Sequence, residues 1–167
     1  IMAGGLGKRM RPITTKLPKP MIKFKNKPIL EHIINKLRSQ GFKDITISIR
    51  YLGKKIKNYF KTGESFGVNI EYLNEKKALG TAGSLSLINS KNLKDATVII
   101  NADTIFDLNL IDIINFHKKK KSLMTMALRQ EFLKSSHGII KSKGFIFDKI
   151  EEKPIITTYV NAGIYIL

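Results

Sequence analysis

The sequence predicts an α/β fold, a three-layer sandwich in which helices cover both faces of a mostly parallel sheet. Segments with the apolar period of a helix alternate along the chain with segments that have the period of a strand. The 167 residues are 43% hydrophobic, which is enough to bury one sizeable core. We therefore expect a single domain over residues 1–167.

The first half of the chain shows this alternation clearly. Residues 28–40 carry one apolar stripe with a helical period, and Gly41 follows them as a typical helix stop. Residues 44–49 place isoleucine at every second position, which is typical of a strand. We expect the next elements to be a helix over 54–61, a strand over 68–73, a helix over 81–89 and a buried strand over 97–100.

The second half begins with a helical period over 108–120 and a strand pattern over 123–128. From His137 onward the pattern changes to closely spaced strand-like pieces at 137–141, 144–150 and 159–167. Such pieces predict an antiparallel addition at the edge of a Rossmann-like, mostly parallel sheet. Because ligands of open α/β sheets bind at the carboxyl ends of the strands, the loops after the strands form the candidate site.

The amino-acid composition limits the classes of protein and the cellular compartments that we expect. The chain has no cysteine, which excludes a disulfide framework, a thiolate metal site and a cysteine nucleophile, and a reducing cytoplasm is the expected location. No apolar run reaches the roughly 18 to 20 residues that a bilayer span needs, so we expect no membrane partner. The chain opens on Ile1 and ends in a strand pattern, so we expect a domain that is incomplete at both ends. The sequence leaves homo-oligomerisation open.

The formal net charge of +17 raises the question of nucleic-acid binding. Most of the basic residues are lysines scattered over expected helix surfaces, and the one dense block, at 118–121, falls where a helix C-terminus favours positive charge. The chain has no tryptophan and no run of aromatic residues interleaved with arginine on which bases would stack. We therefore expect no nucleic-acid partner and read the charge as favouring phosphorylated substrates.

A glycine-rich loop follows the first strand pattern. Gly4, Gly5 and Gly7 allow the backbone to approach phosphate oxygens and to point successive N–H groups at them. Lys8 and Arg9 add positive charge where negative charge develops in phosphoryl chemistry. The alternative is a tight turn that uses glycine for its conformation alone.

Two common glycine loops do not fit this segment. A Walker A loop requires Ser or Thr after Gly-Lys, where this chain has Arg9, and a dinucleotide fingerprint requires glycine at Met10. Further along, Lys19 stands between Pro18 and Pro20, which aims an ammonium group with little backbone freedom. A purely structural turn remains the alternative for Lys19.

Together the glycine loop, Pro12 and the Lys19-Pro20-Met21 segment resemble the signature of the sugar nucleotidylyltransferases, which include glucose-1-phosphate thymidylyltransferases and mannose-1-phosphate guanylyltransferases. Five later motifs match in order, at 79–83, 101–103, 137–138, 152–154 and 161–163. The resemblance spans essentially the whole chain. It implies an enzyme that joins an NTP to a hexose 1-phosphate and releases pyrophosphate.

The resemblance also implies a role for each matching residue. The catalytic set would be Arg9, Lys19 and Asp103, with Mg²⁺ held by Asp103. The nucleotide-binding set would be Ala3, Gly4, Gly5, Gly7, Lys8, Glu75, Gly80 and Thr81. The sugar-phosphate set would be Gly138, Glu152, Lys153 and Asn161. His137 departs from the aromatic residue that often precedes the matching glycine, and a second metal-binding aspartate of the family would lie beyond residue 167.

Taken without the resemblance, several of these residues have ordinary explanations. An aspartate after a strand, such as Asp103, is most often a helix cap or turn former, and the charged segment at 151–154 reads as a turn. Two other classes stay open: a nucleotide-binding regulatory module without turnover, and a nucleotidylyltransferase whose acceptor is not a sugar phosphate.

Hydrogen-bonding capacity favours GTP as the nucleotide. Glu75 precedes the motif at 79–83, and an ionised carboxylate offers only acceptors, which match the adjacent N1–H and 2-amino donors of guanine. Uracil and thymine present one donor flanked by acceptors, which suits an amide better. UTP, dTTP and CTP remain alternatives, and the motifs do not distinguish among sugar 1-phosphates.

Overall fold

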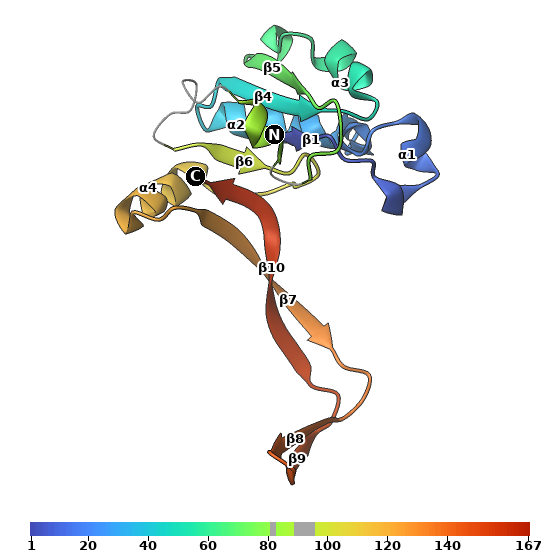
Figure 1. The fold of residues 1–167 in the computed structure, drawn as a ribbon, viewed down its shortest axis with the longest axis vertical. Helices are drawn as coiled ribbons and strands as arrows, with labels where there is room; N and C mark the ends of the chain where they lie inside the picture. The colour runs from blue at the N-terminus through green and yellow to red at the C-terminus, as the bar shows by residue number, and fades with distance from the viewer. Residues whose placement is uncertain (81–82, 89–95) are drawn as a thin grey trace. The chain divides into compact units, whose positions relative to one another are not determined.

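The computed structural model describes residues 1–80, 83–88 and 96–167 (Figure 1). The chain divides into two compact units. The first comprises Ile1–Thr125 with Gly163–Leu167, and the second comprises Met126–Ala162. The first unit holds the parallel sheet, whereas the second is built of antiparallel strands.

The parallel sheet has the order β1-β4-β5. Its strands are β1 (Met2–Ala3), β4 (Asp44–Ile49) and β5 (Asn69–Asn74). Both pairings are parallel, with Met2 opposite Ser48 and Asp44 opposite Asn69. A parallel bridge from Met2 to Asn101 adds the end of β6 (Val98–Ile100) beside β1. The carboxyl ends of these strands therefore meet at one edge of the first unit.

Strand β10 (Ile155–Ile166) provides the antiparallel addition. Ile164 lies opposite Ile100 in the antiparallel pairing of β10 with β6, and the strand order is β6-β10-β7 with β7 at Thr125–Lys134. The predicted fold class, a mostly parallel sheet with an antiparallel edge addition, is confirmed. Strands β7 and β10 are longer than the patterns at 123–128 and 159–167 indicated.

One face of the parallel sheet is covered by α2 (Ile29–Ser39) and α3 (Gly53–Phe60). Strand β4 buries its isoleucines, and a Cβ on Gly53 would lie 3.0 Å from the side chain of Ile49. The Tyr59 hydroxyl donates to Glu31 Oε2 at 2.8 Å, so the two helices pack on the same face. Burial disfavours the Glu31 carboxylate, but hydrogen bonds from Tyr59 and Lys27 outweigh this and lower the pKa of Glu31.

The opposite face carries the short 3₁₀ helix η4 (Gly83–Leu87). Thr46 and Ser48, which alternate with the buried isoleucines of β4, line a cavity of about 430 Å³ together with Ser84 and Leu85. The α-helix predicted over 81–89 is thus a 3₁₀ helix within its described part, and residues 81, 82 and 89 lie outside the described residues. Ser86 Oγ donates to the Gly83 carbonyl at 2.7 Å, a local bond that favours a tight turn over an α-helix.

Helix α4 (Leu110–Lys120) begins two residues later than predicted. Asn109 caps it, because its side chain accepts from the backbone N–H of Ile111 at 3.0 Å. The Gln40 side chain donates to the Leu108 carbonyl at 2.8 Å and accepts from the Leu110 N–H at 2.7 Å, which ties this start to the end of α2. None of the helices in the described ranges has the length and apolar composition that a bilayer crossing requires.

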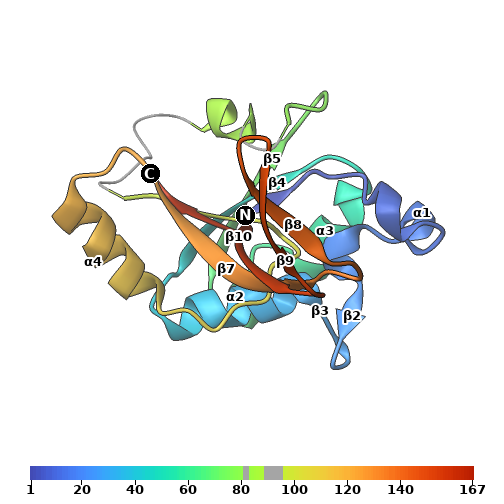
Figure 2. The same ribbon diagram turned by 90° about the horizontal axis from the view of Figure 1, so that it is seen from below.

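The second unit is an antiparallel ribbon of β7 and β10 with a hairpin of β8 (Ile139–Lys143) and β9 (Ile146–Glu151) (Figure 2). Ile139 lies opposite Glu151, and the register shifts between Lys141 and Ser142. The remaining short elements belong to the first unit: η1 (Lys8–Met10), α1 (Ile13–Lys16), η2 (Lys19–Met21), β2 (Lys23–Phe24), β3 (Lys27–Pro28) and η3 (Glu64–Phe66).

Candidate active site

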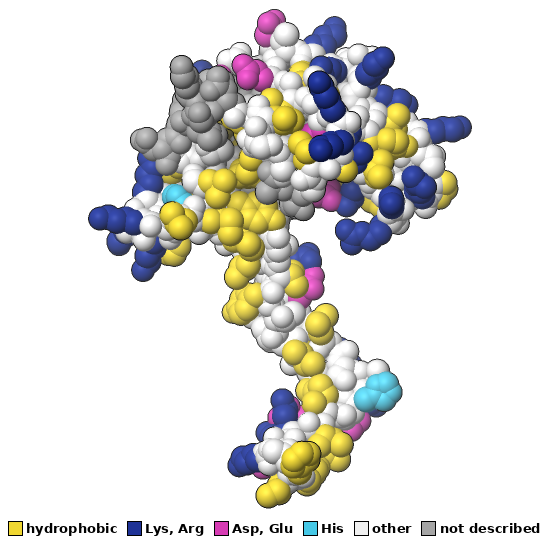
Figure 3. Space-filling model, viewed as in Figure 1, with side chains coloured by type: hydrophobic (Ala, Val, Ile, Leu, Met, Phe, Trp, Pro, Cys, Tyr) yellow, Lys and Arg dark blue, Asp and Glu magenta, His cyan; other side chains and the backbone are white. Residues whose placement is uncertain are grey.

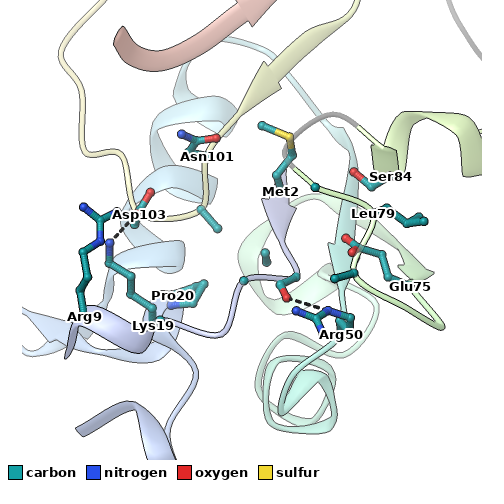
Figure 4. A pocket seen from close by; sticks show the side chains of 17 residues that line it. Met2, Arg9, Lys19, Pro20, Arg50, Glu75, Leu79, Ser84, Asn101 and Asp103 are labelled. Carbon is teal, nitrogen blue, oxygen red and sulfur yellow. Dashed lines mark hydrogen bonds and ion pairs between the residues drawn. The ribbon is translucent and has the colours of Figure 1, made fainter. Parts of the chain in front are cut away.

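A pocket of about 430 Å³ opens where the parallel strands of the first unit end (Figure 4). The segments that follow β1, β4, β5 and β6 each contribute to its wall, as the position rule for open α/β sheets predicts. Its lining residues are Met2, Ala3, Gly4, Gly5, Gly7, Arg9, Lys19, Pro20, Arg50, Glu75, Ala78, Leu79, Gly80, Ser84, Asn101, Ala102 and Asp103.

Gly7 needs to be glycine for two reasons. Its φ is +61°, in the left-handed region that favours glycine, and a Cβ there would lie 2.9 Å from the Thr14 methyl carbon. Thr14 is fully buried, and its hydroxyl donates to the Gly7 carbonyl at 2.9 Å. Helix α1 therefore stabilises the conformation of the glycine loop through Thr14.

Gly4 lies against the carboxylate of Glu75. A Cβ on Gly4 would come within 2.5 to 2.9 Å of the carboxyl atoms of Glu75. Ser48 Oγ donates to Glu75 Oε1 at 2.9 Å, and the Glu75 backbone N–H donates to the Ile49 carbonyl at 3.0 Å. Strand β4 thus fixes the carboxylate beside the glycine loop. Across residues 1–80, 83–88 and 96–167, Glu75 Oε2 has no hydrogen-bond partner, which leaves it available to a ligand.

Three charged side chains gather in another part of the same pocket. Lys19 Nζ forms an ion pair with the Asp103 carboxylate, and both side chains are about one-third exposed. Figure 4 shows Arg9 beside this pair. Asp103 follows β6, whose end is fixed because the Ala102 N–H donates to the Met2 carbonyl at 3.1 Å. Arg9 and Asp103 therefore face one pocket, as the sequence predicts.

Two carboxylates line the pocket, those of Glu75 and Asp103, and Asp103 is the one that lies beside Arg9 and Lys19. No group of three or more His, Cys, Asp or Glu side chains that could enclose a metal occurs in the described part of the chain. This donor set still fits Mg²⁺, which is commonly held by one or two carboxylates together with substrate phosphates.

The residues predicted to bind the sugar phosphate belong to the second unit. A Cβ on Gly138 would lie 2.9 Å from Glu152 Oε2, so these two residues are in contact at the base of the β8-β9 hairpin. Lys153 adopts a left-handed φ of +43°, and its Nζ lies 4.0 Å from Glu152 Oε1. Asn161 is exposed on β10 of the same unit. The structure thus brings Gly138, Glu152 and Lys153 together.

The family model described as nucleotidyl transferase matches residues 1–167, the whole chain. This chain belongs to the nucleotidyl transferase family. A mannose-1-phosphate guanyltransferase of Yarrowia lipolytica is 37% identical over all of the chain and 48% of the relative. A UTP–glucose-1-phosphate uridylyltransferase of Synechocystis is 36% identical over 99% of the chain and 47% of the relative. The chain spans about half the length of these curated relatives.

One solved structure has a fold similar to that of this chain. HddC from Yersinia pseudotuberculosis, complexed with GMP-PN, superposes with a TM-score of 0.76 at 25% identity and covers 99% of the chain and 74% of HddC. The family that the sequence motifs resemble is therefore confirmed. The roles of individual residues in this chain remain predictions.

Most of the predicted nucleotide-site residues meet in the pocket: Ala3, Gly4, Gly5, Gly7, Arg9, Lys19, Glu75, Gly80 and Asp103. Lys8 is exposed on η1 and is not part of the lining, and Thr81 lies outside the described residues. The sequence reasoning overlooked Arg50, Ser48 and Ser84. Arg50 directly follows β4, so the rule that strand carboxyl ends hold ligands could have found it.

The contact of Gly4 with Glu75 leads to a prediction about base choice. We expect Gly4→Ala to displace the Glu75 carboxylate, because the added methyl would overlap it, and to reduce GTP affinity by about tenfold while affecting UTP less. Gly5→Ala is the matched control, since a Cβ there meets no atom within 4 Å. Titration calorimetry with GTP and UTP measures both variants, and an unchanged GTP-to-UTP ratio in Gly4→Ala would contradict the role of this contact.

Proposed function

We propose that this protein transfers a nucleotidyl group from GTP to a hexose 1-phosphate, producing a GDP-sugar and pyrophosphate. The observation that carries the proposal is the single pocket in which the glycine loop, Arg9, Lys19 and Asp103 face one another with Glu75 on the other side. The names of the guanyltransferase and uridylyltransferase relatives support the reaction class. From the cysteine-free composition we place the reaction in the cytoplasm.

The backbone N–H groups of the glycine loop would bind the triphosphate, and Arg9 would neutralise the charge on the departing pyrophosphate. The phosphate oxygen of the hexose 1-phosphate attacks the α-phosphorus of GTP, and the bond from that phosphorus to the pyrophosphate oxygen breaks. The attacking oxygen is already ionised, so no side-chain nucleophile or base is required. Positioning and charge neutralisation then supply most of the rate enhancement.

Asp103 would hold Mg²⁺ together with the phosphates of GTP. Bound there, the ion would neutralise phosphate charge and fix the geometry of the in-line displacement. Lys19, which pairs with Asp103 in the free protein, would then turn its ammonium group toward the α-phosphate. Because the pair is partly exposed, its separation costs little free energy.

Glu75 supports GTP over UTP, dTTP and CTP. Ser48 holds one carboxylate oxygen in place, and the carboxylate can accept from the N1–H and 2-amino groups of guanine. The relative that bears the name of a guanyltransferase and the guanine-nucleotide complex of HddC agree with this preference. A uridylyl transfer is the second candidate, because the relative from Synechocystis carries that name at similar identity.

The sugar 1-phosphate would bind through the second unit. Lys153 would pair with the phosphate, Glu152 and Asn161 would bond hydroxyl groups, and Gly138 would allow close approach of the backbone.

Figure 3 shows lysine and arginine side chains spread over the visible face and not gathered in one stripe, which supports small phosphorylated substrates over a nucleic acid.

Pyrophosphate release tests this proposal. GTP, UTP, dTTP, CTP and ATP are each combined with mannose 1-phosphate, glucose 1-phosphate and glucosamine 1-phosphate in the presence of Mg²⁺. We expect release with GTP that depends on one of the sugar phosphates. Nucleotide binding without release from any combination would instead support a regulatory module, and release with UTP alone would support the second candidate.

A further inference from the structure

Arg50 is a cation of the pocket that the phosphate chemistry leaves unexplained. It follows β4 directly, is half-buried, and donates from Nε to the Gly4 carbonyl at 3.2 Å. In the described ranges no carboxylate lies within ion-pair distance of its guanidinium group. The terminal Nη1 and Nη2 donors are therefore free for a ligand of the pocket.

The position of Arg50 separates it from the phosphate-binding cations. Arg50 and Glu75 both contact Gly4. Arg50 Nε donates to the Gly4 carbonyl, and the Glu75 carboxylate packs against the Gly4 α-carbon. Figure 4 shows Arg50 and Glu75 on one side of the pocket, with Arg9, Lys19 and Asp103 on the other. Arg50 and Glu75 do not form an ion pair with each other, so both keep their capacity to bind a ligand.

We propose that Arg50 reads the base of the nucleotide: its Nη1 and Nη2 donate to O6 and N7 of guanine while Glu75 accepts from N1–H and the 2-amino group. This rests on the proposed use of GTP. Guanine presents two adjacent acceptors beside two adjacent donors, and a forked pair of donors with a carboxylate is complementary to that edge. Adenine places an amino donor where O6 lies, and pyrimidines have no N7, so Arg50 discriminates against both.

Binding of GTP and 7-deaza-GTP tests this role, because the analogue replaces the N7 acceptor with a C–H group and leaves the phosphates unchanged. Isothermal titration calorimetry on the full-length protein, without sugar phosphate, measures both affinities. We expect the unmodified protein to bind 7-deaza-GTP about tenfold more weakly than GTP. In Arg50→Met the two nucleotides are expected to bind with equal affinity, because the donor to N7 is gone.

Two further variants keep the result interpretable. Arg38→Met removes the same charge from α2, outside the pocket, and is expected to keep the tenfold difference. Arg50→Lys keeps the positive charge but not the planar fork, so it is expected to keep only part of the difference, whereas Arg50→Met abolishes it. If Arg50→Met fails to fold, the lysine variant carries the test.

An undiminished difference in both Arg50 variants would overturn the base-reading role, as would no difference in the unmodified protein. Arg50→Met could instead weaken the binding of GTP, 7-deaza-GTP and UTP equally, with binding restored in Arg50→Lys. That result would show that Arg50 contacts a phosphate and would overturn the base-reading role. Pyrophosphate release from GTP by the unmodified protein keeps the proposed function separate. If the protein turns over GTP but binds GTP and 7-deaza-GTP equally, only the role of Arg50 is refuted. Turnover restricted to UTP refutes both the role of Arg50 and the proposed use of GTP.

Discussion

Turnover of the full-length protein falls by about a hundredfold or more when Asp103 is replaced by asparagine, if Asp103 holds Mg²⁺. The substitution keeps the shape of the side chain and removes the charge that retains the ion between the phosphates. The ion pair with Lys19 is also lost, but a partly exposed pair contributes at most about 1 kcal/mol to folding. Pyrophosphate release at several Mg²⁺ concentrations measures the loss.

Asp107 supplies a matched control for this experiment. It also pairs with a lysine, Lys36, but it is exposed and does not line the pocket. Asp107→Asn is therefore expected to leave turnover nearly unchanged. Near-normal turnover of Asp103→Asn would refute the metal role, and a large fall in its melting temperature without ligand would support a structural role as a turn or cap residue.

Lys19→Ala and Lys153→Ala are expected to lower activity through different substrates. Lys19 lines the pocket proposed to bind GTP, so its loss is expected to reduce kcat/KM for GTP by about a hundredfold. Lys153 lies beside Glu152 in the second unit, so its loss is expected to act mainly on the KM for the sugar phosphate, by about tenfold or more. Initial rates with each substrate varied separately measure both effects.

A control for this pair comes from a lysine that does not line the pocket. Lys36→Ala removes one positive charge from α2, and we expect both substrate dependences to stay near those of the unmodified protein. An unchanged sugar-phosphate dependence in Lys153→Ala would contradict the placement of that substrate. An effect of Lys19→Ala confined to the sugar phosphate would contradict the placement of the nucleotide.

The elements that the sequence predicted well are those with a long, regular apolar period. Strand Asp44–Ile49 has the predicted bounds, and helix Ile29–Ser39 falls within the predicted 28–40, because local periodicity determines both. The lengths of Thr125–Lys134 and Ile155–Ile166 depend instead on pairing between strands far apart in sequence, which periodicity does not report. The 3₁₀ turn at Gly83–Leu87 depends on a serine hydroxyl that donates a hydrogen bond to a backbone carbonyl of the same turn.

The residues of the candidate site could likewise be predicted from sequence only in part. The glycine loop, Lys19 and Asp103 stand in recognisable motifs, so the sequence identified them one by one. The rule for strand carboxyl ends predicted that Arg9 and Asp103 would share one pocket, but the contact between Lys19 and Asp103, which are 84 positions apart, depends on the folded chain. Arg50 stands at a strand carboxyl end, but no motif singled it out, and its hydrogen bond to the Gly4 carbonyl joins segments 46 positions apart.

The proposed reaction transfers the α-phosphorus of GTP to a sugar phosphate. Its most direct test follows the label from [α-³²P]GTP and [γ-³²P]GTP in parallel reactions with the hexose 1-phosphate that supports release. We predict that the α label appears in a nucleotide-sugar product and the γ label in pyrophosphate. Transfer of the γ label to the acceptor, or its release as inorganic phosphate by a preparation free of pyrophosphatase, would contradict the account.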